Sequence, residues 1–344
     1  MQYGTGQLAD AGRRRRQQMP TVAIWAASGA LFLALTIYVF AAWLLSADFK
    51  PTLPGAPLDA TTSRLIFWNQ LIFSAICILC IWVWVVKPKL KTGRFSFLGL
   101  LAIASATTYW QDPMSNYYSF GIAYNAGFWN RGSWANFIPG FSYPGMERFP
   151  EAPLWVGTTY VWFNVLFPVA FAAVWLRLDR RFPRLRFGAS IAVLLLLMFI
   201  VDVIQEVLYL RMGLYSYVGA IHSASIFGGR YFQFPIYIGT ITSLFWLSVT
   251  WLIYKRNDKG QSAVELGIER LPLSARASTF VRFLALVGVM NLITLVAYFV
   301  PVQWLYTHGD AIPADTPGYL INGLCGPAAG FPCPGPRVPL PRRN

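Results

Sequence analysis

Charged residues are scarce in this chain: Asp, Glu, Lys and Arg make up only 12% of its 344 residues, while 56% of the residues are hydrophobic and 17% are aromatic. Soluble globular domains usually carry about 25% charged residues. The composition therefore excludes an ordinary soluble protein and predicts a membrane protein.

Histidine and cysteine are also rare, with two and four copies respectively, which disfavours a histidine-based metal site or a disulfide scaffold. Cys77 and Cys80 have the spacing of a redox or zinc motif, but they lie in an apolar segment where packing is the expected role. Cys325 and Cys333 are either bridged or free. A glycine-rich phosphate loop, a nucleotide fingerprint and a serine-nucleophile elbow are absent, so we expect neither a metal nor a cofactor.

Seven stretches approach the roughly 20 apolar residues that a helix needs to cross about 30 Å of hydrocarbon. Phe95 to Trp110 departs most from this length and contains Ser105, Thr107 and Thr108. We predict an all-α, multi-pass membrane bundle of about seven transmembrane helices within residues 21–326. The predicted spans are Thr21 to Ser46, Leu65 to Val86, Phe95 to Trp110, Leu154 to Leu176, Phe187 to Leu210, Ile236 to Tyr254 and Thr279 to Val302.

The basic residues alternate between the two sides of this arrangement. Nineteen of the 28 Lys and Arg residues fall in the N-terminus and in every second connection after it, and nine fall in the longer segments between. Because positive residues near span ends stay in the cytoplasm, we predict an internal N-terminus and an external C-terminus in a plasma membrane. The net charge of +14 is then explained by orientation, and no nucleic-acid partner is expected.

Both ends of the chain are predicted to lack regular structure. Residues 1–20 are polar and basic, and the tail 327–344 is rich in proline. The run Arg13 to Arg16 before an apolar stretch is also seen in signal peptides, but the 26 residues from Thr21 to Ser46 are too long for the apolar region of such a signal. We interpret this stretch as an anchor.

The connection 111–153 is too long for a simple loop. It contains eleven aromatic residues, whereas disordered segments contain few, so we predict a lid folded over the external end of the bundle. An aromatic belt at the lipid interface is the alternative, but a belt does not need the Asp and Asn residues found here. The candidate substrate contacts in this segment are Asn116, Tyr117, Tyr124, Asn125, Asn130 and Trp134.

The shorter connection Arg211 to Pro235 resembles the lid in composition. It contributes His222, a further candidate substrate contact, which is either a base or an ordinary loop residue.

Two acidic residues lie well inside a predicted span. Asp202, Gln205, Glu206 and Tyr209 are spaced i, i+3, i+4 and i+7 and therefore share one helix face. A carboxylate at mid-bilayer costs about 2.5–3.5 kcal/mol or more, and such residues normally face a bundle interior or a wet cavity. At about 1.5 Å per residue, Glu206 lies roughly 6 Å and Asp202 roughly 12 Å below the outer edge. Two carboxyl groups this close are not expected to be ionised together, so they could share a proton.

Alternatives to a catalytic site remain at this point. The pair could belong to a structural polar cluster with Asn69, Gln70, Asn164 or Asn291, or to a proton-coupled transporter. Asp112 is a third candidate carboxylate, although a residue before proline is also common in turns.

The sequence contains the strings Gln111 to Tyr118, Tyr124-Asn125, Asn130 to Trp134, Ile138 to Phe141, Asp202 to Glu206 and Asn322 to Gly326. Together these strings resemble the spirocyclase AveC-like family of membrane proteins. The resemblance implies a multi-pass bacterial protein that closes a spiroketal ring, or removes water, on a lipophilic polyketide- or terpenoid-like metabolite. It does not imply particular catalytic residues.

The carboxylates suit this chemistry, which needs one acid and one base. We predict Glu206 as the acid, Asp202 as the base or charge-stabilising group, and Asp112 as a polar contact from the lid. Gln205 and Tyr209 are further candidate substrate contacts, and the lipophilic substrate would enter from the lipid. A proton-coupled transporter, disfavoured because no inverted repeat is visible, and a non-catalytic partner subunit are the alternative functions.

Overall fold

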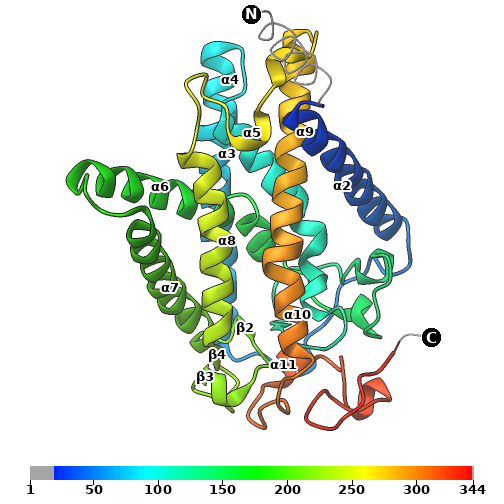
Figure 1. Ribbon diagram of the computed structural model, residues 1–344. Coiled ribbons are helices and arrows are strands. Elements are labelled where there is room, and N and C mark those ends of the chain that lie inside the picture. The colour runs from blue at the N-terminus through cyan, green and yellow to red at the C-terminus, as the bar shows by residue number, and fades with distance from the viewer. Residues whose placement is uncertain (1–18, 343–344) are drawn as a thin grey trace, which may run out of the picture.

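The computed structural model describes residues 19–342, which form a bundle of long helices (Figure 1). The start of α2, α4 and the start of α9 lie at one end of the bundle, and the short strands and α11 lie at the other (Figure 1). The run Arg13 to Arg16 and most of the predicted disordered N-terminus 1–20 lie outside the described residues.

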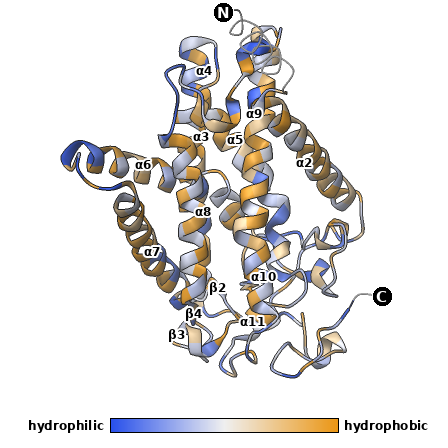
Figure 2. Cartoon of the chain, in the orientation of Figure 1, coloured by the Kyte–Doolittle hydropathy of each residue, from blue (hydrophilic) through white to orange (hydrophobic). Residues whose placement is uncertain are grey.

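Five helices in the described part of the chain are long and apolar enough to cross a membrane. Their outward faces carry large apolar side chains that are more than half exposed, such as Leu31, Ile78 and Ile204, and apolar colouring dominates these helices in Figure 2. So much exposed apolar surface suits lipid rather than water. The five are α2 (Thr21–Leu44), Ala60–Thr92 (α3 Ala60–Ile81, η1 Trp82–Val86 and α4 Lys87–Thr92), α7 (Phe187–Arg211), α8 (Ile236–Tyr254) and Ala275–Tyr306 (α9 Ala275–Ile293, η9 Thr294–Phe299 and α10 Val300–Tyr306).

Two predicted spans have a different form. The stretch Phe95 to Trp110 contains α5 (Phe97–Ala106), which ends after ten residues and continues as the 3-10 helix η2 (Thr107–Asn116). At 1.5 Å per residue, α5 covers only about half of the hydrocarbon thickness. The stretch Leu154 to Leu176 is divided between the π-helix η5 (Pro153–Gly157) and α6 (Phe163–Arg181). The count of seven spans therefore stays a prediction.

Glycine allows α2 and α9 to pack backbone against backbone. A methyl group on Gly29 would lie 1.8 Å from the carbonyl oxygen of Leu284, and one on Gly288 would lie 2.4 Å from that of Trp25. Small residues that permit such close approach are typical of helix pairs in membranes.

The segment 111–153 is folded and largely buried. Seven of its eleven aromatic side chains are buried, among them Phe120, Tyr143 and Phe149, whereas Tyr118 and Trp129 are half exposed. Most of these rings therefore pack into the protein instead of forming an interfacial belt. The segment contains β1 (Ala123–Tyr124), η3 (Ala135–Phe137) and η4 (Met146–Arg148).

Short strands join this segment to the connection Arg211 to Pro235. β1 pairs antiparallel with β2 (Tyr215–Ser216), with Tyr124 opposite Tyr215. A second antiparallel pair follows in the same connection, formed by β3 (Ser225–Ile226) and β4 (Phe234–Pro235), with η6 (His222–Ala224) before it.

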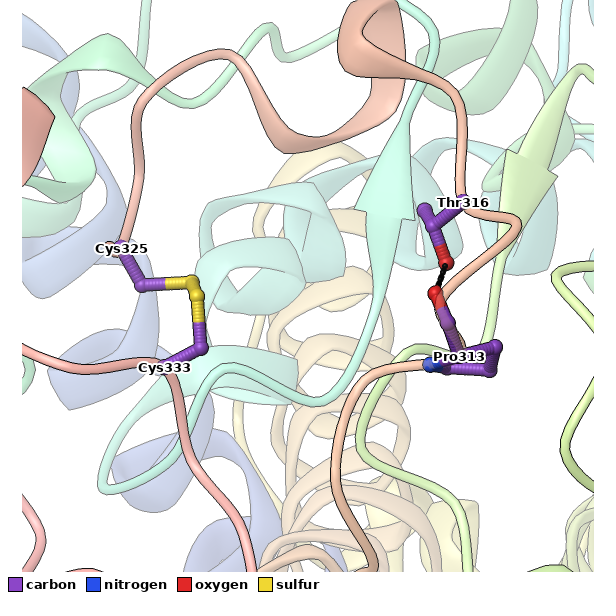
Figure 3. Close-up of a disulfide and its surroundings, with 4 residues drawn as sticks. All are labelled: Pro313, Thr316, Cys325 and Cys333. Carbon is purple, nitrogen blue, oxygen red and sulfur yellow. Dashed lines mark hydrogen bonds between the residues drawn. A yellow bond between two sulfur atoms is a disulfide. The ribbon is translucent and has the colours of Figure 1, made fainter. Parts of the chain in front are cut away.

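The proline-rich tail, predicted to be without regular structure, begins with fixed contacts. After α11 (Gly318–Ile321), the 3-10 turn η10 (Pro327–Ala329) lies within a loop closed by the disulfide between Cys325 and Cys333, whose Cα atoms are 4.8 Å apart (Figure 3). A backbone bridge between Gly326 and Phe331 supports the same loop. Cys77 and Cys80 are both buried and free.

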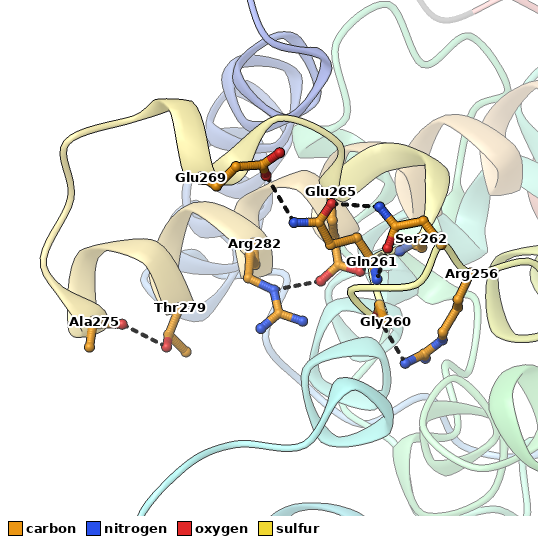
Figure 4. Close-up of polar contacts among 10 residues, drawn as sticks. Arg256, Gly260, Gln261, Ser262, Glu265, Glu269, Ala275, Thr279 and Arg282 are labelled. Carbon is orange, nitrogen blue, oxygen red and sulfur yellow. Dashed lines mark hydrogen bonds and ion pairs between the residues drawn. The ribbon is translucent and has the colours of Figure 1, made fainter.

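At the opposite end of the bundle, a buried glutamate fixes the connection between α8 and α9 (Figure 4). Glu265 caps the 3-10 helix η7 (Ala263–Glu265) by accepting hydrogen bonds from the amide and hydroxyl of Ser262. Its other oxygen pairs with Arg282 on α9 at 2.6 Å. The 3-10 helix η8 (Ile268–Arg270) follows before α9 begins.

Candidate active site

A cavity of about 150 Å³ lies among α7, α8, η9 and the folded segment 111–160. Asp112 and Glu206 are its two acidic residues, and no Lys, Arg or His from the described residues lines it. The remaining lining is mainly aromatic and hydroxylic: Phe73, Ser115, Ile122, Tyr124, Trp155, Val156, Thr159, Tyr160, Phe163, Asn164, Tyr209, Tyr215, Tyr217, Thr242, Phe245, Thr294, Tyr298 and Phe299.

Glu206 enters the cavity from α7 and is held by two tyrosines. Tyr215 and Tyr217 both donate hydrogen bonds from their hydroxyl groups to Oε2 of Glu206, the second at 2.7 Å. The pairing of β1 with β2 positions these tyrosines, which are two residues apart in extended chain and therefore face the same way. The other carboxyl oxygen, Oε1, has no hydrogen bond to the described residues.

Asp202 lies one helical turn deeper and is fully buried. Its Oδ1 accepts a hydrogen bond from Gln205 at 3.2 Å. Neither Asp202 nor Gln205 lines the cavity, whereas Tyr209 on the same helix does. The polar face of α7 therefore points inward, with Glu206 and Tyr209 as its members at the cavity.

Asp112 enters the cavity from η2, where Pro113 follows it inside the 3-10 helix. Its Oδ1 accepts hydrogen bonds from the hydroxyl groups of Tyr160 at 2.7 Å and Tyr124 at 3.2 Å. Burial raises the pKa of Asp112, and the hydrogen bonds to this carboxylate partly offset that rise.

Glu151 is a carboxylate that the sequence analysis missed. It is only 1% exposed, its Oε1 accepts a hydrogen bond from Ser133 at 3.2 Å, and its carboxyl group is in hydrogen-bond contact with that of Asp112. Burial, followed by the charge of Asp112, raises the pKa of Glu151 well above its usual range. The only signal in the sequence was an acidic residue between apolar neighbours in a proline-flanked loop, which resembles an ordinary exposed turn.

Two π-helical segments contribute to the cavity wall. η5 supplies Trp155 and Val156, and η9 supplies Thr294, Tyr298 and Phe299. The π-helix is rare and is often found at functional sites, because its wider turn redirects side chains.

The predicted asparagine contacts support the chain instead of lining the cavity. Asn116 accepts hydrogen bonds from the amides of Gly121 and Ile122. Asn125 and Asn130 likewise bond to main-chain groups, including Gly213 O and Thr52 N.

Only some of the predicted aromatic and histidine contacts line the cavity. Tyr124 lines the cavity, but Tyr117 donates to the carbonyl of Pro139 and Trp134 donates to that of Trp110. His222 lies in the connection Arg211 to Pro235, where its backbone amide donates to Asp310 at 2.7 Å. Tyr117, Trp134 and His222 are not part of the lining.

The polar residues proposed as structural partners of the pair bond elsewhere. Asn291 accepts from Trp110 and Gln111, Gln70 accepts from the amide of Trp129, and Asn69 donates to a carbonyl in its own helix. Asn164 lines the cavity. Among the described residues, none of these four side chains is hydrogen-bonded to Asp202 or Glu206.

The fold and the cavity together define a helical protein with five candidate membrane-spanning helices among the described residues and a carboxyl-lined internal site. The chain belongs to the spirocyclase AveC-like family: the family model described as Spirocyclase AveC-like matches residues 93–320, about two thirds of the chain. The matched region includes Asp112, Glu151, Asp202 and Glu206. Neither a curated protein nor a solved structure matches the chain.

Proposed function

We propose that this protein is a membrane-embedded cyclase or dehydratase that acts by acid–base catalysis on a neutral, lipophilic metabolite of polyketide or terpenoid type. The observation that carries the proposal is that Asp112 and Glu206, from separate elements, line one cavity to which the described part of the chain contributes no cationic side chain. Two carboxyl groups on different walls can serve as acid and base toward one substrate.

Spiroketal closure uses these groups in order. In the proposed reaction, Glu206 protonates the hydroxyl of a hemiketal, which leaves as water and gives an oxocarbenium ion. A second hydroxyl of the substrate attacks this carbon, and Asp112 accepts its proton. Dehydration follows the same first step, with Asp112 removing a proton from the neighbouring carbon. Either reaction releases one water and needs no redox partner.

The cavity wall supports both the charge and the size of the proposed substrate. Aromatic faces such as those of Trp155 and Tyr298 favour a nearby positive charge. Among the described residues no Lys, Arg or His lines the cavity, which disfavours phosphate or carboxylate groups. A volume of about 150 Å³ matches cavities that hold a benzene-sized ring. The cavity would therefore enclose the reacting ring while the rest of the molecule extends toward lipid.

Both carboxyl groups at the cavity accept two tyrosine hydroxyls on one oxygen, so these bonds alone do not separate the acid from the base. We assign the roles from the second oxygen of each group, because the carboxyl group of Asp112 contacts that of Glu151, whereas Oε1 of Glu206 has no hydrogen bond to the described residues. Glu206 keeps Oε1 free for a proton directed at the substrate, and Asp202 contributes negative charge or a shared proton behind it. This arrangement gives Asp112 the base role that the sequence analysis gave to Asp202.

We also propose the orientation predicted from the positive residues, with the N-terminus inside and the C-terminus outside. Segment 97–181 begins and ends on the same side whether α5–η2 and η5–α6 cross the bilayer as two spans or enter it and return. The sidedness of the remaining helices is therefore the same for five or seven spans. The carboxyl cavity would then open toward the outer half of a bacterial plasma membrane.

Metabolite profiling of a deletion strain tests the function. We expect an uncyclised or hydrated precursor to accumulate, and the wild-type gene to restore the product. Glu206→Gln and Asp112→Asn should each reduce product formation by about 10²–10⁴-fold, the usual contribution of a general acid or base. Glu147→Gln is the matched control, because Glu147 lies in the same segment but not in the cavity lining. Each variant is checked for membrane insertion by fluorescence-detected size exclusion.

Two results would reject the proposal. One is wild-type product formation by both Glu206→Gln and Asp112→Asn. The other is a deletion strain with an unchanged metabolite profile whose membranes lose transport of a small molecule, which would favour the transporter instead.

A further inference from the structure

The buried contact between Asp112 and Glu151 raises the question of where a proton resides. Oδ1 of Asp112 accepts two tyrosine hydroxyls, while Oδ2 has no donor among the described residues. Oε1 of Glu151 accepts the hydroxyl of Ser133, while Oε2 has no donor. Each carboxyl group thus has one oxygen without a donor, and the two groups are in hydrogen-bond contact.

Two ionised carboxylates cannot be held together stably at this place. The titratable groups that face the pair are tyrosines: Tyr109, Tyr124, Tyr160 and Tyr298. No Lys, Arg or His among the described residues contacts the pair to compensate a second negative charge. Like charges in contact within a low-dielectric interior force one group to remain protonated. A single proton between the two oxygens also satisfies both atoms that otherwise have no donor.

We infer that Glu151 carries this proton and donates it in a hydrogen bond to Asp112, so that Asp112 remains a proton acceptor toward the cavity. The donors around the pair decide the direction. Asp112 accepts two hydroxyl groups and Glu151 only one, and hydrogen bonds to a carboxylate favour its charged form.

This inference rests on the proposed function and adds a positioning residue to it. Glu151 does not line the cavity and does not touch the substrate. It acts through Asp112, by keeping that carboxyl group deprotonated and oriented. Because η2 carries Asp112 and a different loop carries Glu151, this contact also fixes the cavity wall.

Infrared spectroscopy of the purified protein in lipid nanodiscs at pH 7 tests the inference without a substrate. The carbonyl stretch of a protonated carboxyl group is separate from the bands of carboxylates. Labelling glutamate with ¹³C at its side-chain carboxyl shifts glutamic-acid bands and leaves aspartic-acid bands in place. We expect one label-sensitive band that disappears in Glu151→Gln and persists, at a shifted frequency, in Asp112→Asn. Glu147→Gln is the control and should leave the band unchanged.

Two outcomes would overturn the inference. In one, Glu151→Gln leaves every label-sensitive band intact. In the other, the affected band is insensitive to glutamate labelling and disappears in Asp112→Asn, which places the proton on Asp112. Should Glu151→Gln fail to fold, a Glu206→Gln spectrum without a label-sensitive band would equally reject the inference, because the proton that Glu206 itself carries is then removed.

The result is independent of the proposed reaction. Loss of the Glu151 band in a protein whose Asp112→Asn variant turns over normally would keep the proton on Glu151 and reject the catalytic proposal. Loss of turnover in Asp112→Asn, with no band assigned to Glu151, would keep the catalytic proposal and reject the placement of the proton on Glu151. A pH profile then adds a functional measure: Glu151→Leu, which removes the donor, should move the acidic limb to higher pH, and Glu151→Gln should move it less.

Discussion

The two tyrosines that hold Asp112 should contribute unequally to stability. Tyr160 donates to Oδ1 at 2.7 Å and Tyr124 at 3.2 Å. A hydrogen bond to a charged group contributes about 1.5–3 kcal/mol, so Tyr160→Phe should lower the free energy of unfolding by about that amount, and Tyr124→Phe by less. Phenylalanine preserves the ring packing of Tyr160 against Tyr109, whose ring centroids are 5.1 Å apart.

Equilibrium unfolding in detergent micelles, followed by circular dichroism, measures both variants. Tyr118→Phe is the control, because this side chain is half exposed and its hydroxyl has no recorded hydrogen bond. A double-mutant cycle of Tyr160→Phe with Asp112→Asn isolates the interaction energy. An equal or larger loss in Tyr124→Phe, or a coupling energy near zero, would refute the reasoning from these distances.

The same bond affects the ionisation of Asp112. Hydrogen bonds to a carboxylate favour its charged form, so loss of the Tyr160 donor should raise the pKa of Asp112. A base must be deprotonated to act. The acidic limb of the pH–rate profile should therefore move to higher pH in Tyr160→Phe.

Two further predictions concern packing and pH. Gly288→Val places a side chain where a methyl group would already lie 2.4 Å from the Trp25 carbonyl oxygen. Separating α2 from α9 should cost about 1–3 kcal/mol, measured as a lower unfolding midpoint. Gly188→Val is the control and should not lower the midpoint, because an added methyl group there meets no atom within 4 Å. Burial raises the pKa of Glu151 above the ordinary 4.5, so the folded state binds a proton that the unfolded state releases. Its stabilising contribution is present at pH 4.5 and below and is lost as pH rises through the folded-state pKa. Thermal unfolding at several pH values should show a decline toward alkaline pH that is smaller in Glu151→Gln, and an equal decline in both proteins would contradict the assignment.

The sequence carried enough information for the class of protein and for one wall of the cavity. Low charge and long apolar stretches predict helices in a membrane, because transferring charged groups into hydrocarbon is costly. The spacing of Glu206 and Tyr209 predicts a shared face, because helical periodicity is local. Both residues line the cavity.

Other parts of the site depended on contacts between distant segments. Asn116 and Asn130 have the composition expected of a binding loop, yet their amides are used by nearby main chain. Glu151 looked like a turn residue, and only the folded segment brings it to Asp112. The length of α5 was also not readable, because the continuation of a helix as a 3-10 segment depends on what packs around it.

The amino-acid sequence by itself determined that this chain forms apolar helices and that one of them carries a polar face, because hydropathy and helical period act over neighbouring residues. Only the tertiary structure decided which carboxyl groups meet. Asp112 and Glu151 are separated by a folded loop, and Glu206 is brought to the same cavity by α7 and the β1–β2 pair. Burial and the resulting proton sharing depend on distances between segments, and no local pattern in the chain records those distances.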